Sequence, residues 1–192
     1  MINETEEFEE IKFDNTNFSE KNLMSKEYTS CNFINCNFTS AVFMDLKFID
    51  CSFFNCNFTS TKMDGCKFQD TKFDGCKFMG VDFRRIDTFI LTFKFEKCLI
   101  DGCNFSDLIL QGVDFLESDV KNCFYSKTDL TGCTFSGSDL SKTEFHDCDL
   151  TEVDFRQAIN YSINPDTNKF KKTKFSSPEV ISLLHYKDII ID

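Results

Sequence analysis

The 192-residue sequence has no tryptophan, two prolines, seven glycines and two histidines, and basic residues are outnumbered by acidic ones. Its 21 Lys and Arg against 32 Asp and Glu give a net charge of −11, which argues against direct binding of DNA or RNA. No run of 18 apolar residues is present and the first residues are acidic, so we expect neither a transmembrane helix nor a signal peptide. We therefore expect a soluble, cytoplasmic protein without membrane association.

Phenylalanine is abundant, and its 25 copies recur with a period of five residues. Large apolar residues occupy every fifth position from Phe8 to Phe83, sixteen in all. The frame then slips by two residues, resumes at Ile90 and continues through Phe155. We call these large residues the centres and expect them to form the core. Representative centres are Phe33, Phe38, Phe53, Phe58, Phe105 and Phe135.

The residue two positions before each centre is usually small, and all 11 cysteines occupy this position. Residues two apart share one face of an extended strand, so we expect the small residue and the centre both to point inward. The spacing of Cys31 and Cys36 does not match a zinc site, and stacked cysteines twenty residues apart do not match disulfide geometry. We therefore expect buried free thiols, no metal and no cofactor, as in a reducing compartment.

A period of five does not fit an α-helix and is typical of a short extended segment followed by a corner. From Phe95 onward the aromatic centres alternate with aliphatic ones, and cysteines recur at twenty residues, as in Cys31 and Cys51. The alternation requires an even number of faces, and four faces of five residues fit both patterns, whereas three faces fit neither. The sequence therefore predicts an all-β solenoid, a quadrilateral β-helix with about 20 residues per coil.

Several segments resemble the A(D/N)LXX repeat of pentapeptide-repeat proteins. Examples are residues 36–40 (CNFTS), 66–70 (CKFQD), 128–132 (TDLTG) and 138–142 (SDLSK). The resemblance covers roughly residues 6–158, and it implies that the β-helix is right-handed. It says less about function, because one fold supports many functions.

Two regions depart from the repeat. Residues 1–30 place Glu6, Lys21 and Lys26 at the inward position, where a charge is costly, so irregular first coils that form an N-terminal cap or a short surface loop are expected there. Residues 31–158 are expected to form the regular β-helix, with a frame break at residues 84–94. This break should extrude two residues and expose Arg84 and Arg85 as a candidate contact.

Residues 159–192 are expected to form a C-terminal cap with a short helix. Ser176 is the predicted N-cap, with Pro178 and Glu179 in the first turn. In pentapeptide-repeat proteins of the quinolone-resistance type (Qnr and MfpA), a C-terminal helical segment makes a head-to-head dimer. The resemblance therefore implies a homodimer through this tail. The candidate interface residues are Val180, Ile181, Leu184, Ile189 and Ile191.

The charge is concentrated in the C-terminal coils. Residues 101–160 carry twelve acidic and four basic residues, a net −8, whereas residues 61–100 carry a net +2. Acidic residues directly precede seven centres: Asp114, Asp119, Asp129, Asp139, Glu144, Asp149 and Asp154. Regular negative charge on a rod about as wide as a DNA duplex would offer a DNA-like potential to a basic groove.

The resemblance to the quinolone-resistance members implies a non-enzymatic DNA mimic. Such a protein would bind a type II topoisomerase (DNA gyrase or topoisomerase IV) and modulate its activity or protect it from quinolones. The acidic residues also fit a simpler role, the solubility of a Phe-rich rod. The alternative function is an interaction scaffold or structural rod with an unknown partner, which would use residues 84–94 or a ring of lysines. The ring is formed by Lys62, Lys67, Lys72 and Lys77.

Catalysis finds little support in the sequence. His146 and His185 are isolated, without a residue placed beside them that would orient a proton transfer. No glycine-rich phosphate loop is present, and glycines such as Gly65 and Gly132 fall at the expected corners. We therefore expect no enzymatic activity.

Overall fold

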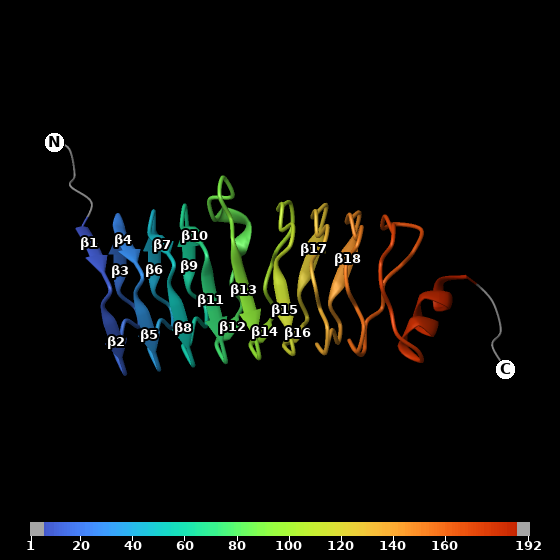
Figure 1. The fold of residues 1–192 in the computed structure, drawn as a ribbon, viewed down its shortest axis with the longest axis horizontal. Helices are drawn as coiled ribbons and strands as arrows, with labels where there is room; N and C mark the ends of the chain where they lie inside the picture. Colours follow the sequence, from blue (N-terminus) through green and yellow to red (C-terminus); the bar gives the residue numbers. More distant parts are fainter. Residues whose placement is uncertain (1–5, 188–192) are drawn as a thin grey trace.

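The computed structural model describes residues 6–187, which wind into a rod of about seven turns (Figure 1). The strands are three or four residues long, and each pairs in parallel with at least one strand of a neighbouring coil. Phe33, for example, is in register with Phe13 and Phe53. The predicted four-sided β-helix is confirmed. No helix in this part of the chain is long and apolar enough to cross a membrane.

Four faces follow one another around each coil, and we number them in chain order. Face 1 carries β1 (Glu6–Glu9), β4 (Lys26–Thr29), β7 (Lys47–Ile49) and β10 (Lys67–Gln69). Face 2 carries β2 (Lys12–Asp14), β5 (Asn32–Ile34), β8 (Ser52–Phe54), β11 (Thr71–Asp74), β13 (Phe93–Glu96) and β15 (Asp114–Leu116). Face 3 carries β12 (Lys77–Met79), β14 (Leu99–Asp101) and β16 (Asp119–Lys121). Face 4 carries β3 (Asn22–Met24), β6 (Val42–Met44), β9 (Lys62–Asp64), the 3₁₀ helix η1 (Phe83–Arg85), β17 (Phe124–Ser126) and β18 (Glu144–His146).

Isolated parallel bridges extend the faces where the segments are shorter than a strand. On face 3 they run along Asn17, Asn37, Asn57 and Lys77. On face 1 they link Ile109, Asp129, Asp149 and Lys169. On face 2 they link Asp114, Thr134, Asp154 and Lys174. Faces 2 and 3 are therefore continuous ladders within residues 6–187, whereas no pairing joins β10 to Ile109 on face 1 or β9 to η1 on face 4.

The core is a column of stacked rings. Along one face the rings lie parallel: the centroids of Phe33 and Phe53 are 4.6 Å apart with an interplanar angle of 8°. Between neighbouring faces they meet edge to face, as Phe33 and Phe38 do at 63°. Both arrangements suit the aromatic quadrupole. The predicted core centres are confirmed, each at most 2% exposed: Phe33, Phe38, Phe53, Phe58, Phe105 and Phe135.

The small inward residues also satisfy buried backbone carbonyls. The Cys133 thiol donates to the Leu110 carbonyl at 2.8 Å, and the Thr61 hydroxyl donates to the Phe38 carbonyl at 2.8 Å. The acceptor lies in each case on a centre of the preceding coil. A buried carbonyl without a donor costs free energy, so a small side chain that donates is favoured at this position. All 11 cysteines are free and buried, as the sequence predicts.

The regular coils begin earlier than expected. β1 to β4 already pair in the standard register, so the prediction of an irregular cap over residues 1–30 is wrong for residues 6–30. The charges at the inward position are accommodated at the open end of the rod, where Lys26 pairs with Glu6 and lies 5.1 Å from the Phe8 ring. The Lys21 ammonium similarly lies 5.6 Å from the Phe18 ring.

At the frame break the chain takes 22 residues to complete a coil, because Phe73 pairs with Phe95. The prediction that the core resumes at Ile90 is wrong, since Ile90 is 53% exposed. Phe93 enters the interior instead, in register with Thr71 at a position that is normally small. Because the face 1 segment of this coil is extruded, the interior has room for a large ring there. Figure 1 shows the extruded loop projecting beside β10.

The C-terminal segment ends in the short 3₁₀ helix η2 (Glu179–Tyr186). The predicted N-cap is wrong: Pro178 precedes the helix without a capping side chain, and the Ser176 hydroxyl accepts the Gln157 N–H at 2.9 Å instead. The Tyr186 hydroxyl lies 2.7 Å from the Ser162 hydroxyl, and Leu183 packs against the core. The segment therefore covers the last coil.

One core residue is expected to be suboptimal. Tyr125 is 1% exposed, stacks on Phe105 and Phe145 at 5.0 Å, and its hydroxyl has no hydrogen-bond partner within residues 6–187. Tyr125→Phe is therefore expected to raise the free energy of unfolding by about 1–2 kcal/mol, measured by urea denaturation. Tyr125→Leu should lower it, because the stacked ring is lost. A destabilising Tyr125→Phe variant would contradict this account.

Candidate protein-interaction surface

The predicted acidic residues are distributed over all four faces of the C-terminal coils. Asp129 and Asp149 are neighbours on face 1, and Asp119 and Asp139 are neighbours on face 3. Asp114 and Asp154 lie on face 2 with Thr134 between them, and Glu144 lies in β18 on face 4. The structure thus gathers these residues into one region of the rod without bringing them into a single cluster.

Four of these aspartates also hold the backbone. One side-chain oxygen of Asp129, Asp139, Asp149 and Asp154 accepts the backbone N–H two residues later, at 2.9 to 3.0 Å. Asparagine does the same in the N-terminal coils, where Asn57 accepts the Thr59 N–H at 3.0 Å. A short polar side chain that bonds its own backbone is a standard turn device. The aspartates therefore have a structural role that needs an acceptor but not a negative charge.

Several of the acidic residues are paired with cations. Lys121 lies between Asp119 and Asp139, at 3.1 and 2.9 Å. Asp154 is paired with Arg156 at 2.6 Å, and Asp149 is paired with Lys169 at 2.5 Å. Within residues 6–187, Asp114, Asp129 and Glu144 form no ion pair. The negative surface is therefore weaker than the sequence count suggests.

The contacts shift the titration of these carboxyls. The Arg156 guanidinium holds the pKa of Asp154 below its usual value. Partial burial alone would raise the pKa of Asp139, but hydrogen bonds from Ser141 and Asn160 and the Lys121 ammonium lower it overall. These carboxylates stay ionised in the folded protein at neutral pH.

A lowered folded pKa makes the fold sensitive to acid. The contribution of Asp139 to stability is present above its unfolded pKa of 3.8 and is lost as the pH falls through its folded value. In urea titrations at a series of pH values, Asp139→Asn should be less stable than the wild type at neutral pH, and this deficit should shrink below pH 3.8. Asp139→Ala, which also loses the turn acceptor, should cost about 1 kcal/mol more at every pH. A constant difference between Asp139→Asn and wild type would contradict the assignment.

The two arginines at the break are exposed but tied to neighbouring carboxylates. Arg84 forms a fork with Asp82, with nitrogen–oxygen distances of 2.9 and 2.7 Å, and Arg85 pairs with Asp64. Both lie in η1 on face 4, before the projecting loop. The lysine ring is partly neutralised too, because Lys67 pairs with Asp87 and Lys72 with Glu96.

The projecting loop, residues 87–92, carries an apolar tip that the periodicity does not reveal. Phe89 is 86% exposed, and together with Ile90 it encloses a hollow of about 160 Å³ against outward residues of β7 and β10 on face 1. Ile109, the next face 1 residue along the rod, is 62% exposed. The two-residue slip in the frame is the only sequence signal for this patch. We call Phe89, Ile90 and Ile109 the loop patch.

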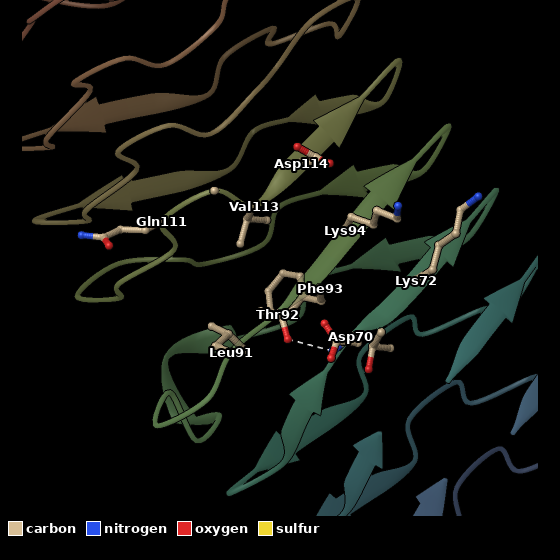
Figure 2. A pocket seen from close by; sticks show the side chains of 11 residues that line it. Asp70, Lys72, Leu91, Thr92, Phe93, Lys94, Gln111, Val113 and Asp114 are labelled. Carbon is tan, nitrogen blue, oxygen red and sulfur yellow. Dashed lines mark hydrogen bonds between the residues drawn. The ribbon is translucent and has the colours of Figure 1, made fainter. Parts of the chain in front are cut away.

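A second hollow, of about 280 Å³, lies at the base of the loop between faces 1 and 2 (Figure 2). It occupies the space that the missing face 1 segment would fill. In a regular coil the corner N–H donates to the next coil, as Asp50 does to the Gln69 carbonyl, but here the Asp70 N–H donates to the Thr92 hydroxyl at 2.8 Å. Lys94 and Asp114 lie on the other side of the hollow. The loop thus replaces a lost backbone bond by a side-chain bond.

The predicted dimer residues are only partly placed. Residues three apart share one face of a 3₁₀ helix, and Ile181 and Leu184 form such a pair on η2, 42% and 41% exposed. Val180 is half-buried. Ile189 and Ile191 lie outside the described residues. Among residues 6–187, no group of three or more His, Cys, Asp or Glu side chains could hold a metal ion.

These features define a class of protein: a four-sided parallel β-solenoid built from five-residue repeats. A family model for a pentapeptide repeat region matches residues 26–105, and one for pentapeptide repeats matches residues 126–158. The chain belongs to the pentapeptide-repeat family. Proteins with this fold are typically structural or interaction scaffolds. No curated protein sequence matches the chain.

Solved structures of the same fold include two trypsin-treated variants of QnrB1, a plasmid-mediated fluoroquinolone resistance protein. One is 12% identical, with a TM-score of 0.66 over 97% of this chain and 100% of that chain. The other is 19% identical, with a TM-score of 0.60 over 98% of each chain. HetL, a pentapeptide repeat protein involved in heterocyst differentiation regulation from the cyanobacterium Nostoc sp. strain PCC 7120, is 12% identical with a TM-score of 0.67, over 88% of this chain and 85% of that chain. At these identities the similarity concerns the fold alone.

Proposed function

We propose that this protein is a cytoplasmic, non-enzymatic DNA mimic. It binds a type II topoisomerase, either DNA gyrase or topoisomerase IV. In this role it modulates the enzyme or protects it from quinolones. The observation that carries the proposal is the acidic surface of the C-terminal coils, with a net −8 over residues 101–160 on a straight rod. A basic groove that accepts duplex DNA would attract such a rod over a long range. The fold shared with QnrB1 over nearly the whole chain supports the choice of partner.

The proposal includes a homodimer through the C-terminal segment. Support comes from the exposed apolar pair Ile181 and Leu184 on η2, at the end of the rod next to the acidic coils. Head-to-head contact would place two acidic segments on either side of the junction, and so produce one long negative rod. Replacing both residues by glutamate should remove this contact.

The test is a gyrase supercoiling assay titrated with this protein, with and without a fluoroquinolone, followed by the same assay with topoisomerase IV. We expect relief of poisoning or inhibition of supercoiling. Combined Asp129→Asn, Asp139→Asn and Asp149→Asn should weaken the effect about 10-fold and reduce its salt sensitivity. Asparagine keeps the turn acceptor, as Asn37 and Asn57 do, so the fold should survive.

A matched control changes the same number of charges in the N-terminal half, through Asp45→Asn, Asp50→Asn and Asp70→Asn. This variant should act like the wild type. The proposal fails if the protein has no effect on either enzyme, or if both triple variants behave alike.

The second candidate function is an interaction scaffold for another protein partner. It is favoured by the loop patch, because neighbouring exposed apolar side chains such as Phe89 and Ile90 mark protein-interaction sites. In that case Phe89→Ser should abolish partner capture, while the acidic triple variant should leave it unchanged.

A further inference from the structure

Face 1 carries a charge pattern that complements itself when reversed. On face 1 the residue before each centre points outward. From the loop toward the N-terminus, these outward residues are Lys67, Lys47 and Glu27. Away from the loop toward the C-terminus, the same position is occupied by Ile109, Asp129, Asp149 and Lys169. The charges toward the N-terminus are therefore basic, basic and acidic in that order. Toward the C-terminus, the charges after Ile109 are acidic, acidic and basic.

A pattern of this kind suits two copies of the chain packed face 1 to face 1 with their rods antiparallel. A twofold contact must be self-complementary, and here its axis would run along the strand direction, between the loop and Ile109. Each outward column then faces the same column of the second copy in reverse order. Lys67 faces Asp129, Lys47 faces Asp149, and Glu27 faces Lys169 of the second copy.

The ion pairs within one chain are retained in this arrangement. Lys47 pairs with Glu27 at 2.9 Å, and Asp149 pairs with Lys169 at 2.5 Å. In the dimer, the Lys47–Glu27 pair of one copy lies opposite the Asp149–Lys169 pair of the other. Each of the four charges therefore gains a second neighbour of opposite sign. Such a network is more favourable than isolated surface pairs, and the twofold axis produces it twice.

The middle of the contact is apolar. Ile109, 62% exposed, lies between the two charged stretches. Phe89, 86% exposed, lies at the edge of the basic stretch, where it and Ile90 line a hollow with Lys47 and Lys67. An apolar centre within a polar rim is the usual anatomy of a protein interface. The same reversal on face 4 would bring Asp82 opposite Glu144, so that face is not self-complementary. We propose that face 1 is a lateral homodimer interface, formed by two antiparallel copies of this chain.

This inference goes beyond the proposed function and does not rest on it. The lateral contact would enclose Asp129 and Asp149, and the five other acidic residues on faces 2, 3 and 4 would stay open to a partner. The lateral and C-terminal contacts together do not close into a ring, so the wild type should form larger assemblies as its concentration rises.

The test is therefore made in the Ile181→Glu, Leu184→Glu background, where the C-terminal contact is removed, and it measures mass by sedimentation equilibrium. We expect a dimer that weakens with salt. Lys47→Glu and Asp149→Lys are then added separately. Each change places two charges of the same sign opposite each other at both symmetric contacts, and should raise the dissociation constant about 100-fold. An equimolar mixture of these two variants should recover the dimer, because each heterodimer again opposes unlike charges. Lys77→Glu and Asp139→Lys, which make the same charge changes on face 3, are the matched controls.

Carbodiimide cross-linking gives an independent measurement. A Lys47–Asp149 cross-link must join two chains, since the two residues of one chain lie five coils, roughly 24 Å, apart along the rod. We expect this cross-link in the background variant and its loss in Phe89→Asp. A monomer at all accessible concentrations would overturn the proposal. So would a dimer that neither charge reversal affects, or one that both face 3 controls weaken equally.

Discussion

Phe53→Ala is expected to lower the free energy of unfolding by about 3–5 kcal/mol, because it removes one ring from the interior stack and leaves a cavity that the rigid coils cannot close. Phe53 is 1% exposed and stacks on Phe33 at 4.6 Å and on Phe73 at 5.0 Å. Urea denaturation followed by far-ultraviolet circular dichroism provides the measurement.

The neighbouring residue is a control within the same strand. Phe54 follows Phe53 in β8 but points outward and is 47% exposed. Phe54→Ala should change the stability by less than about 0.5 kcal/mol. Similar losses for the two variants would mean that the inward and outward positions have been assigned wrongly.

Phe93→Thr is expected to cost about 3 kcal/mol or more, although threonine is the residue at the corresponding position one coil earlier, Thr71. Phe93 is 5% exposed and its ring lies 5.1 Å from Phe95 and 6.0 Å from Phe68, where it fills the space that the extruded face 1 segment leaves. A threonine there would leave most of that space empty.

Ile90→Thr is the matching variant, because the five-residue frame assigns Ile90 to the core and the structure exposes it. We expect its effect on stability to stay within about 0.5 kcal/mol. Thermal denaturation of both variants would decide between the two assignments. A large loss for Ile90→Thr with a small one for Phe93→Thr would support the frame and contradict the structure.

Most of the fold could be predicted from spacing alone. The alternation of aromatic and aliphatic centres after Phe95 and the recurrence of cysteines at twenty residues indicate the number of faces, and the shared offset of all cysteines indicates the inward positions. The sequence predicts the position of the frame break but not its structure. A count of residues shows that two are extra, whereas the choice between Ile90 and Phe93 depends on which side chain fits an interior that lacks one segment. The early charges were misjudged for a related reason, since at an open end Lys26 can reach Glu6 and solvent.

The sequence predicts which acidic residues lie on the candidate surface but not how strong its negative potential is. The sequence locates Asp139 and Asp154 on the outside of the rod, as the structure confirms by their register. It does not show that Lys121 and Arg156 neutralise them or that their oxygens hold the turns, because these contacts depend on which residues lie one coil apart and on local backbone geometry. The exposed Phe89 could not be predicted, because it falls in the frame break, where the five-residue spacing assigns no inward or outward positions.

The interruption of face 1 has a consequence for how the rod opens. Stability in a solenoid is approximately a sum of terms within each coil and between adjacent coils, and at this point only three of the four ladders cross from one coil to the next. The coils up to β10 and the coils from β14 onward should therefore behave as two cooperative units that are weakly joined at the break. In native-state hydrogen exchange, the amides next to the break should become labile at lower denaturant than those of β5 or β16, and the two halves should show separate opening energies.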